Sequence, residues 1–463
     1  MKGILSKQLG RIALVCVAVV LVLFLGFVVG RMGGGDVNKT VVEKKPVVPV
    51  AIEGALTMAN WKGSYPLQYN SYMKTELMGD KPGKYGGAAE PHDAQHLDIQ
   101  TEMRTNFKGF GFGKDYADDR GHYWAVYDAK NTKRPNTKGA CISCKTPYVA
   151  AFFERDGWGY AKEYGDTSLW DQIPDSEPGV GCYMCHDPWT MNLHIIQPAL
   201  LEAGQALGID FNTAPVEDMR TYVCAQCHVT YYMNPVPESS KVIFPWDEGA
   251  SVNKPPGAAE PNLTVDNIWK HYERVRKETA TETHFNADYK QADSQVEVVK
   301  VRHPEYETWS MGVHGKSGVA CADCHMPYQI ENGEKYSSHY MTSPLRTIER
   351  SCGRCHDQGS EWLLERVMQI QDNTFLAQRL AGQKIEEAHK AIAEAAETAG
   401  VNEAKLKEAR ELCRKAQFYW DFVAAENSMG FHAPDQIIRT LTQALQFASD
   451  AVVAAYKASG RLK

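Results

Sequence analysis

The sequence predicts a mainly α-helical protein with little β structure, and two features of the chain lead to this prediction. Residues 55–357 are rich in glycine, proline and short periodic segments, and five short cysteine pairs are spread along them. Residues 358–463 instead contain long segments with helical periodicity and little proline. We therefore expect short helices arranged around the cysteine pairs, followed by long C-terminal helices.

The N-terminus has the pattern of an export signal. Three basic residues among the first eleven precede an uncharged apolar stretch from Ile12 to Gly30. Nineteen such residues are long for a signal peptide and just sufficient to span a bilayer. Because no clean A-x-A cleavage site follows, residues 1–35 are either a cleaved signal peptide or a retained membrane anchor. Residues 36–54 are expected to form a linker.

Four of the five cysteine pairs have the form CxxCH, which is typical of covalent attachment of c-type haem. They are Cys182-Tyr-Met-Cys185-His186, Cys224-Ala-Gln-Cys227-His228, Cys321-Ala-Asp-Cys324-His325 and Cys352-Gly-Arg-Cys355-His356. Two thiols three residues apart can bond two vinyl groups of one porphyrin, and the next residue then lies under the iron as an axial ligand. Pairs of CxxC can also bind zinc, but a zinc site gives no reason for the repeated histidine.

The remaining pair, Cys141-Ile-Ser-Cys144-Lys145, has a lysine where the axial histidine belongs. An amine must lose its proton to bind a metal, and it donates only σ electrons. Axial ligand identity is a main determinant of haem reactivity. We therefore predict five covalently bound haem c groups, of which four carry electrons and the one on Lys145 performs chemistry. The alternative is a degenerate motif with a solvated lysine.

A count of iron ligands predicts one open iron face. Five haems have ten axial positions, and the motif residues fill five of them. If each CxxCH haem takes a second histidine, only the face opposite Lys145 stays free. Eleven of the fifteen histidines lie outside the motifs, and periodicity does not choose among them. The two other cysteines, Cys16 and Cys413, are not expected to form a disulfide, because they lie in apolar and helical segments.

Composition excludes one class of partner. Charged residues make up 23% of the chain and the net charge is −7, so no nucleic-acid partner is expected. Aromatic residues make up 10% of the chain, which suits an interior filled with porphyrin.

Three long helices are predicted in the C-terminal region. Glu361–Thr398 is followed by Gly400 at the position of a helix C′ residue. Glu403–Asn427 is the second helix, and the third begins at Pro434 and ends near Ser459. Helices of ~25–40 residues are roughly 40–60 Å long. We expect them to form a dimer interface, and a self-contained bundle packed on the haem region is the alternative.

The motif order, one CxxCK followed by four CxxCH, resembles the pentahaem, ammonia-forming cytochrome c nitrite reductases. The segments Cys224–Tyr232, His303–Trp309 and Gly312–Lys316 match this family as well. The resemblance implies a pentahaem catalytic domain at residues 55–357 that reduces nitrite to ammonium with six electrons. The N-terminal export signal predicts a periplasmic location and the long helices predict a homodimer, and we expect a membrane quinol-oxidising multihaem cytochrome as electron donor.

The resemblance also assigns individual residues. The distal histidines of the four CxxCH haems would be, in chain order, His339, His122, His432 and His314. Arg134, Tyr231 and His303 would lie above the open face of the lysine haem. Arg134 offers fixed charge and hydrogen bonds to the nitrite anion, while His303 and Tyr231 can donate protons. From the residues alone, the three could instead be a solvated loop cation, a core tyrosine and a helix cap.

Two positions depart from the pattern of many family members, which bind calcium beside the active site. Those members have a glutamate before the tyrosine and a glutamine before the histidine, where this chain has Thr230 and Arg302. We therefore expect no calcium, and we expect Arg302 to replace it with one positive charge. The alternative is an Arg302 that points to solvent.

Two other functions stay open at this point. One is a pure electron-transfer cytochrome, in which all irons are six-coordinate. The other is a multihaem reductase of hydroxylamine or of a sulfur oxyanion. A high-spin haem signal separates the first from a nitrite reductase, and relative turnover rates separate the second.

Overall fold

The computed structural model describes residues 54–77, 82–85, 94–118, 120–134, 139–160, 168–236, 239–246, 263–279, 281 and 283–463. The predicted signal or anchor at residues 1–35 and the linker up to residue 53 lie outside these residues. Within the described part of the chain, no helix is long and apolar enough to cross a membrane. The described residues, from 54 onward, belong to one compact unit.

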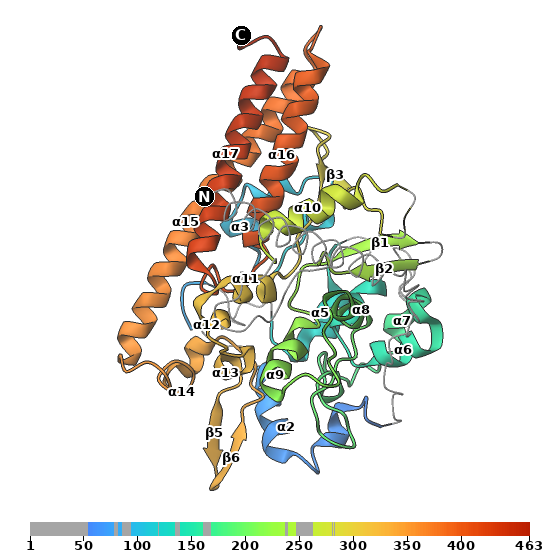
Figure 1. The fold of residues 1–463 in the computed structure, drawn as a ribbon, viewed down its shortest axis with the longest axis vertical. Coiled ribbons are helices and arrows are strands. Elements are labelled where there is room, and N and C mark those ends of the chain that lie inside the picture. Colours follow the sequence, from blue (N-terminus) through green and yellow to red (C-terminus); the bar gives the residue numbers. More distant parts are fainter. Residues whose placement is uncertain are drawn as a thin grey trace, which may run out of the picture. The chain divides into compact units, whose positions relative to one another are not determined.

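Three long helices form the C-terminal region and lie side by side along one edge of this unit (Figure 1). They are α15 (Ser360–Ala396), α16 (Glu403–Ala424) and α17 (Pro434–Ala458).

The ends of these helices have local causes. The side chain of Asn402 caps α16 by accepting a hydrogen bond from the backbone N–H of Lys405 at 3.1 Å. Pro434 begins α17 at a position where its missing N–H costs nothing. Gly400 (φ +74°), just beyond α15, has the left-handed conformation that glycine adopts most readily. The three predicted helices are confirmed, but α15 ends at Ala396 with Glu397 as its C-cap, so Gly400 is not the C′ residue that the sequence predicted.

The internal glycine of α15 has a packing reason. A Cβ atom at Gly382 would lie 2.9 Å from Nε1 of Trp420 on α16 and 3.1 Å from Cγ of Glu102. The carbonyl oxygen of Gly382 also accepts a hydrogen bond from Asn106 at 3.1 Å. Only a residue without a side chain allows α15 to approach both neighbours this closely.

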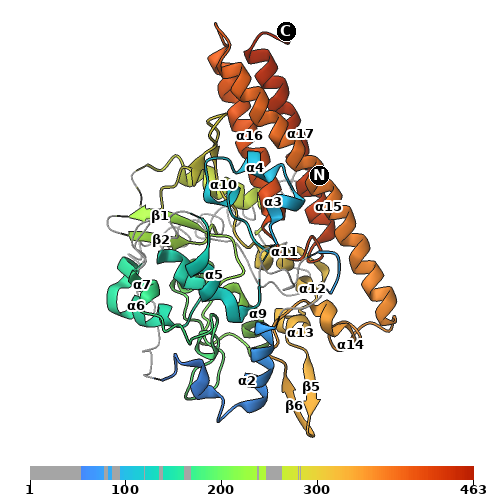
Figure 2. The same ribbon diagram turned by 180° about the vertical axis from the view of Figure 1, so that it is seen from behind.

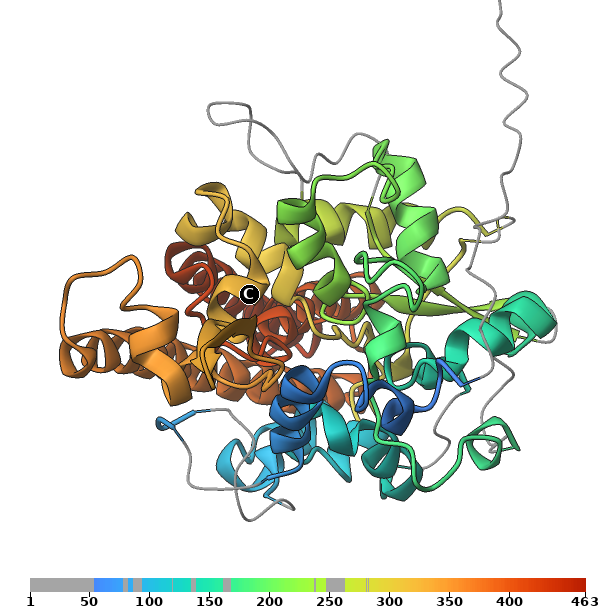
Figure 3. The same ribbon diagram turned by 90° about the horizontal axis from the view of Figure 1, so that it is seen from below.

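The rest of the chain consists of short helices joined by long loops, as predicted (Figure 3). The α-helices are α2 (Pro66–Met73), α3 (His96–Ile99), α4 (Met103–Asn106), α5 (Ala125–Asn131), α6 (Tyr148–Asp156), α7 (Ser168–Asp171), α8 (Pro198–Leu207), α9 (Val216–Ala225), α10 (Val265–Val275), α11 (Glu305–Met311), α12 (Val313–Lys316), α13 (Cys321–His325) and α14 (Ile348–Ser351). The 3-10 helices are η1 (Met58–Trp61), η2 (Lys74–Glu76), η3 (Gly111–Gly113), η4 (His122–Trp124), η5 (Gly139–Cys144), η6 (Gly157–Tyr160), η7 (Cys182–Met184) and η8 (Pro344–Thr347).

The β structure of the described residues is limited to three antiparallel pairs, which confirms the prediction of little β structure. The pairs are β1 (Tyr232–Val236) with β2 (Ser239–Ile243), β3 (Tyr289–Lys290) with β4 (Glu297–Val298), and β5 (Tyr328–Glu331) with β6 (Glu334–Ser337). In the first pair Tyr232 lies opposite Ile243. β1 begins directly after the candidate catalytic residue Tyr231, so this hairpin fixes the backbone on one side of it.

Two hydrophobic clusters form the core. One joins α16 and α17 to the inner face of α15, to α10 and to the apolar residues of 296–301. Short helices of the first half pack against the long ones, with α4 on α15 and α10 on α16 (Figure 2). The other cluster surrounds the first three cysteine motifs. The C-terminal helices therefore share their core with the haem-binding region, and residue 357 marks a change of secondary structure within one unit.

Candidate active site

Each cysteine motif lies on a single turn of chain. The first forms η5, the second begins η7, the third ends α9, the fourth is α13, and the fifth follows α14. In the second, third and fifth motifs the backbone N–H of the histidine donates to the carbonyl of the first cysteine, at 3.0 Å in each case. This turn places both sulfurs and the next side chain on one side of the backbone, as attachment of a porphyrin requires.

The four histidine pairs expected from the resemblance are brought together by the fold. Their ring centroids are 6.0 Å apart for His186 and His339, 6.1 Å for His122 and His228, 6.2 Å for His314 and His356, and 6.4 Å for His325 and His432. A bond from a metal to an imidazole nitrogen is about 2.0–2.1 Å, and the ring centre lies roughly 1.1 Å further on. Two imidazoles on one metal ion therefore have centroids roughly 6.2–6.4 Å apart. The spacing in every pair fits one haem iron between the rings.

The second ring nitrogen of several of these histidines is held by a protein oxygen. Nδ1 lies 3.1 Å from the carbonyl of Met191 in His186, 2.9 Å from that of Thr342 in His325, and 2.9 Å from that of Ser337 in His339. Nδ1 of His432 lies 2.6 Å from the Glu426 carboxylate. Such contacts fix the ring and leave Nε2 for a metal. Burial lowers the pKa of His339 and of His325 to about 4, so both rings stay neutral, the form that binds metals.

The motifs lie close to one another. The thiol of Cys144 interacts with that of Cys227, and the thiol of Cys224 interacts with that of Cys321. Ser351, next to the fifth motif, donates a hydrogen bond to the carbonyl of Cys324 at 2.9 Å. The third motif therefore adjoins both the lysine motif and the fourth, which in turn adjoins the fifth. Haems attached at these positions are near neighbours, as electron transfer requires.

Tyr231 lies beside the lysine motif. Burial raises the pKa of its phenol well above the usual value, and the nearby thiols of Cys144 and Cys141 raise it further. The phenol is therefore protonated at neutral pH and can donate a hydrogen bond. The next residue, Tyr232, is fully buried and belongs to the core. The two adjacent tyrosines thus have different environments.

Arg134 is half-buried and held in place. Its guanidinium carbon lies 4.5 Å from the centroid of the Phe112 ring, and its Nε donates to Oγ1 of Thr132 at 3.0 Å. Asp115 holds this loop in turn, because its carboxylate accepts hydrogen bonds from the Thr132 hydroxyl at 2.9 Å and from the Lys133 N–H at 2.7 Å. These contacts argue against the alternative of a freely solvated loop cation.

His303 has an unusual backbone. Its φ angle is +42°, in the left-handed region that residues other than glycine rarely adopt. The residue after it, Pro304, is the N-cap of α11, and the carbonyl of His303 accepts a hydrogen bond from the first N–H of this helix, that of Glu305, at 2.8 Å. Backbone strain of this kind persists only where the surroundings hold it, and it clusters at functional sites.

Arg302 lies between the segments that carry Tyr231 and His303. Its Nη1 donates to the carbonyl of Tyr231 at 3.1 Å and to that of Lys300 at 2.9 Å, and its Nη2 is bonded to Asp288. The Arg302 side chain is only 10% exposed and that of Asp288 only 3%. Burial opposes the charge of Arg302, but Asp288 outweighs burial and raises the arginine pKa above its usual value. The alternative of an arginine that points to solvent is wrong.

The backbone before Tyr231 is held by a buried carboxyl group. Oε1 of Glu307 accepts hydrogen bonds from the N–H of Thr230 at 3.1 Å and from Nε1 of Trp246 at 3.0 Å. Burial raises the pKa of Glu307 to about 8. Thr230 is itself fully buried. The residue that stands in place of the calcium-binding glutamate is therefore part of a packed, hydrogen-bonded segment.

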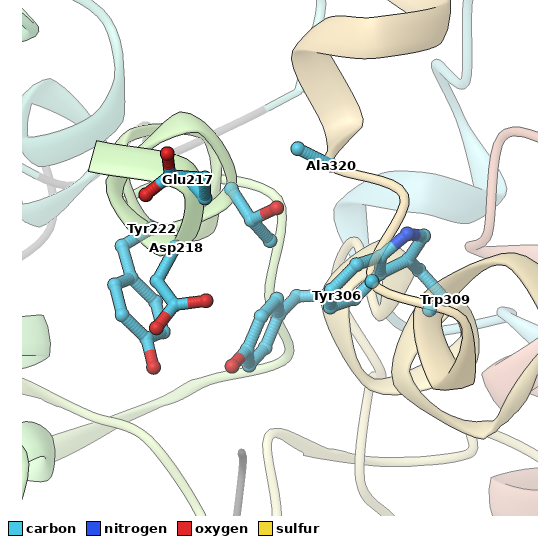
Figure 4. A pocket seen from close by; sticks show the side chains of 9 residues that line it. Glu217, Asp218, Tyr222, Tyr306, Trp309 and Ala320 are labelled. Atoms are coloured by element: carbon cyan, nitrogen blue, oxygen red, sulfur yellow. The ribbon is translucent and has the colours of Figure 1, made fainter. Parts of the chain in front are cut away.

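A cavity of about 40 Å³ lies between α9 and α11 (Figure 4). Asp218 and Tyr222 of α9 face Tyr306 of α11 across it, and Ala320 lies at its edge. The cavity adjoins the third motif, which ends α9, and the fourth, which begins after Ala320. Arg134, Tyr231 and His303 do not line it, so it is not the candidate substrate site.

Comparison with known proteins shows which family has this architecture. The family model described as cytochrome c552 matches residues 57–461. The chain belongs to the cytochrome c552 family. A cytochrome c-552 from Parabacteroides distasonis is 34% identical over 411 residues, which cover 87% of this chain and 77% of the relative. The cytochrome c nitrite reductase subunit NrfA of Nitratidesulfovibrio vulgaris is 34% identical over 425 residues, 86% of this chain and 78% of that subunit.

A solved structure of the same family is also similar. The cytochrome c nitrite reductase of Desulfovibrio desulfuricans ATCC 27774 superposes with a TM-score of 0.79 at 32% identity, over 89% of this chain and 88% of that one. The resemblance inferred from the sequence is thus confirmed at the level of the family, and as a cytochrome c the chain carries covalently bound haem c. The Desulfovibrio enzyme has two calcium sites in its catalytic subunit.

Two acidic residues of the site were not found from the sequence. Asp115 holds the loop of Arg134, and Asp288 pairs with Arg302. Neither lies in a motif, and each partner is more than ten residues away in the chain.

Asp288 also shows that one expectation, a net positive charge from Arg302 in place of calcium, was wrong. Arg302 does not add an isolated positive charge, because the buried carboxylate beside it largely neutralises it.

Proposed function

We propose that this cytochrome c552 reduces nitrite to ammonium at the haem of the Lys145 motif, and that four bis-histidine haems supply the electrons. The observation that carries this proposal is the spacing of the four histidine pairs, 6.0–6.4 Å between ring centroids. These eight histidines would hold the irons of four haems and Lys145 would hold the iron of the fifth, whose remaining coordination site would take the substrate.

The overall reaction consumes six electrons and eight protons: NO₂⁻ + 6 e⁻ + 8 H⁺ → NH₄⁺ + 2 H₂O. When bound, a haem held by Lys145 would supply electrons and an iron at which nitrite is reduced. Arg134 attracts the anion and donates hydrogen bonds to its oxygens, since a guanidinium stays charged at any working pH. Because Phe112 and Thr132 fix Arg134, this charge is in place before nitrite arrives, which is the condition for electrostatic catalysis.

His303 and Tyr231 support the loss of the two oxygens as water. A histidine can give up and regain a proton near neutral pH, so His303 can serve repeatedly during the eight proton transfers. Tyr231 keeps its proton, because burial raises its pKa, and it acts as a hydrogen-bond donor. Arg302 holds the two together by bonding the Tyr231 carbonyl from the residue next to His303.

Arg302 takes the structural place of calcium in this proposal. A hard cation binds oxygen ligands and fixes the segments that supply them. The Arg302 guanidinium does the same for the carbonyls of Tyr231 and Lys300. Its partner Asp288 makes the arrangement nearly neutral overall. Arg302 therefore replaces calcium mainly by holding the backbone of Tyr231 and Lys300 in position, and adds little net charge to the site.

The export signal and the family suggest where the enzyme works. We place it in the periplasm, with electrons entering a bis-histidine haem from a membrane quinol-oxidising multihaem cytochrome. We also propose a homodimer. The three long C-terminal helices support it, because they expose large apolar side chains such as Leu376 and Leu380, which are 62% and 50% exposed.

The proposal is tested by product analysis with reduced methyl viologen as electron donor. The expected result is one ammonium per nitrite and six electrons per turnover, with faster turnover of nitrite than of sulfite or tetrathionate. Equal or faster turnover of a sulfur oxyanion would make the enzyme a reductase of that class instead. Absence of ammonium from a fully haem-loaded protein would favour a pure electron-transfer cytochrome.

A further inference from the structure

Lys300 and Asp421 form an ion pair that is almost completely buried. Nζ of Lys300 lies 2.7 Å from Oδ1 of Asp421, and the two side chains are 1% and 0% exposed. Removing two charges from water is costly, and well-packed apolar residues are often at least as stable in such places. A buried pair is therefore weak support for stability, and its position in the molecule is the better guide to its role.

The ammonium group of Lys300 lies in a cage of three aromatic rings. It is 5.2 Å from the centroid of Phe107, 5.0 Å from that of Phe112 and 5.5 Å from that of Tyr116. The carbonyl of Val301 accepts a hydrogen bond from the same group at 2.7 Å. The faces of aromatic rings attract cations. The charge thus holds the three rings around a fixed point.

One ring of this cage also contacts the candidate substrate-binding arginine. Phe112 lies 4.5 Å from the guanidinium carbon of Arg134 and 5.0 Å from Nζ of Lys300. The neighbouring residue, Gly111, approaches Arg134 so closely that an added Cβ would lie 3.2 Å from the arginine Cβ. A shift of Phe112 would therefore move Arg134 as well.

The same pair also holds the segment that leads to His303. The second carboxylate oxygen of Asp421 accepts a hydrogen bond from the Val301 N–H at 2.7 Å. The Lys300 N–H donates to Asp288 at 2.8 Å, and the Lys300 carbonyl accepts from Arg302 at 2.9 Å. Asp421 belongs to α16, so the Lys300–Asp421 ion pair is anchored in the long C-terminal helices.

We propose that Lys300 and Asp421 are positioning residues for nitrite, which act on Arg134 through Phe112. This inference rests on the proposed function and extends it to substrate recognition. If the pair is removed, Arg134 should lose its fixed position, so the enzyme should bind the nitrite anion more weakly. Hydroxylamine, which is uncharged near neutral pH, depends less on Arg134 and should be affected less.

The test is the double variant Lys300→Met with Asp421→Asn. The asparagine oxygen can still accept the Val301 hydrogen bond, while both charges and the caged ammonium are removed. We expect full haem content, a rise of about tenfold in the dissociation constant of nitrite from spectral titration of the oxidised protein, and a rise in the nitrite KM of similar size. The KM of hydroxylamine should change by about twofold or less.

The control is Arg276→Met with Glu411→Gln, a partly exposed ion pair that joins the C-cap of α10 to α16 and whose arginine also bonds Asn286 and Glu297. Its nitrite affinity should equal that of the wild type. The proposal is overturned if the double variant of Lys300 and Asp421 binds nitrite like the wild type. It is equally overturned if nitrite and hydroxylamine are weakened by the same factor.

A second variant decides the matter if the first does not take up its haems. Phe112→Leu leaves the ion pair in place and removes the ring that contacts both cations. It should weaken nitrite binding selectively, and unchanged nitrite affinity in the haem-loaded protein would refute the positioning role. A wild-type protein that binds nitrite but forms no ammonium would instead contradict the proposed function, so the two failures are distinct.

Discussion

The guanidinium of Arg302 donates a hydrogen bond to the carbonyl oxygen of Tyr231 at 3.1 Å. This contact joins the segment of the hydrogen-bond donor Tyr231 to that of the proposed proton donor His303. Asp288 holds the other end of the guanidinium. The relative position of Tyr231 and His303 therefore depends on the side chain of Arg302. In family members that bind calcium beside the active site, we expect the metal to hold this position.

The first prediction is that activity is independent of calcium and dependent on Arg302. Nitrite turnover should not change on addition of a chelator or of calcium, whereas Arg302→Gln should reduce it by about 10- to 100-fold, the usual effect of losing a group that orients a metal site. Arg302→Lys, which keeps the charge but not the fork of donors, serves as control and should recover only part of the rate. Stoichiometric calcium in the purified enzyme, together with chelator-sensitive turnover, would contradict this prediction.

The second prediction concerns the axial lysine. Lys145→His should still attach haem, because Cys141 and Cys144 are unchanged, but it should lose most nitrite turnover. Haem content is measured by intact mass and turnover by ammonium release. Unchanged turnover at full haem loading would show that the lysine does not determine the reactivity of this iron.

The third prediction concerns the proton donor His303 and the hydrogen-bond donor Tyr231. His303→Ala and Tyr231→Phe should lower the rate without altering haem content, since neither side chain is assigned to an iron. Loss of a general acid typically costs about 10²- to 10⁴-fold in rate. Wild-type activity in His303→Ala would remove this residue from the mechanism, and loss of a low-spin haem signal would make it an axial ligand instead.

The fourth prediction is a pH-dependent stability that comes from Glu307. Burial raises its pKa to about 8 in the folded protein, whereas a solvated glutamate has its ordinary pKa of 4.5. The unfolded chain therefore loses this proton at lower pH than the folded one, so stability should fall as pH rises from about 5 to about 8. Glu307→Gln mimics the protonated form and should flatten this part of the thermal-stability profile.

The control for that profile is Glu334→Gln, a change at an exposed position of β6. It should leave the slope between about pH 5 and about pH 8 as in the wild type. A Glu307→Gln protein with the wild-type slope would show that this carboxyl group titrates normally in the folded state.

The long helices could be predicted from the sequence because their signals are local. Gly400, Pro434 and the apolar periodicity mark their ends and faces within a few residues. The attachment motifs are local as well. Nothing local distinguishes the four distal histidines from the other spare ones, so they came from the family resemblance, and the fold now brings each to its expected partner.

The contacts that support the candidate site could not be predicted in this way. Lys300 and Asp421 are 121 residues apart in the chain, and no periodicity or motif connects them. Asp115 and Asp288 are likewise ordinary acidic residues until the fold places them beside Arg134 and Arg302. A sequence can indicate which residues perform chemistry through their types and spacing. The residues that hold them in position become visible only in the packed structure.

The open iron face is tested most directly by the spin state of the oxidised protein, measured by electron paramagnetic resonance with intact mass on the same sample. The central claim is that Lys145 ligates an iron whose other face is open, while four histidine pairs saturate the rest. We predict a mass with five haems, one of them high-spin, and a change in the high-spin signal when one equivalent of nitrite is added. A spectrum with only low-spin haems that does not respond to nitrite would contradict it.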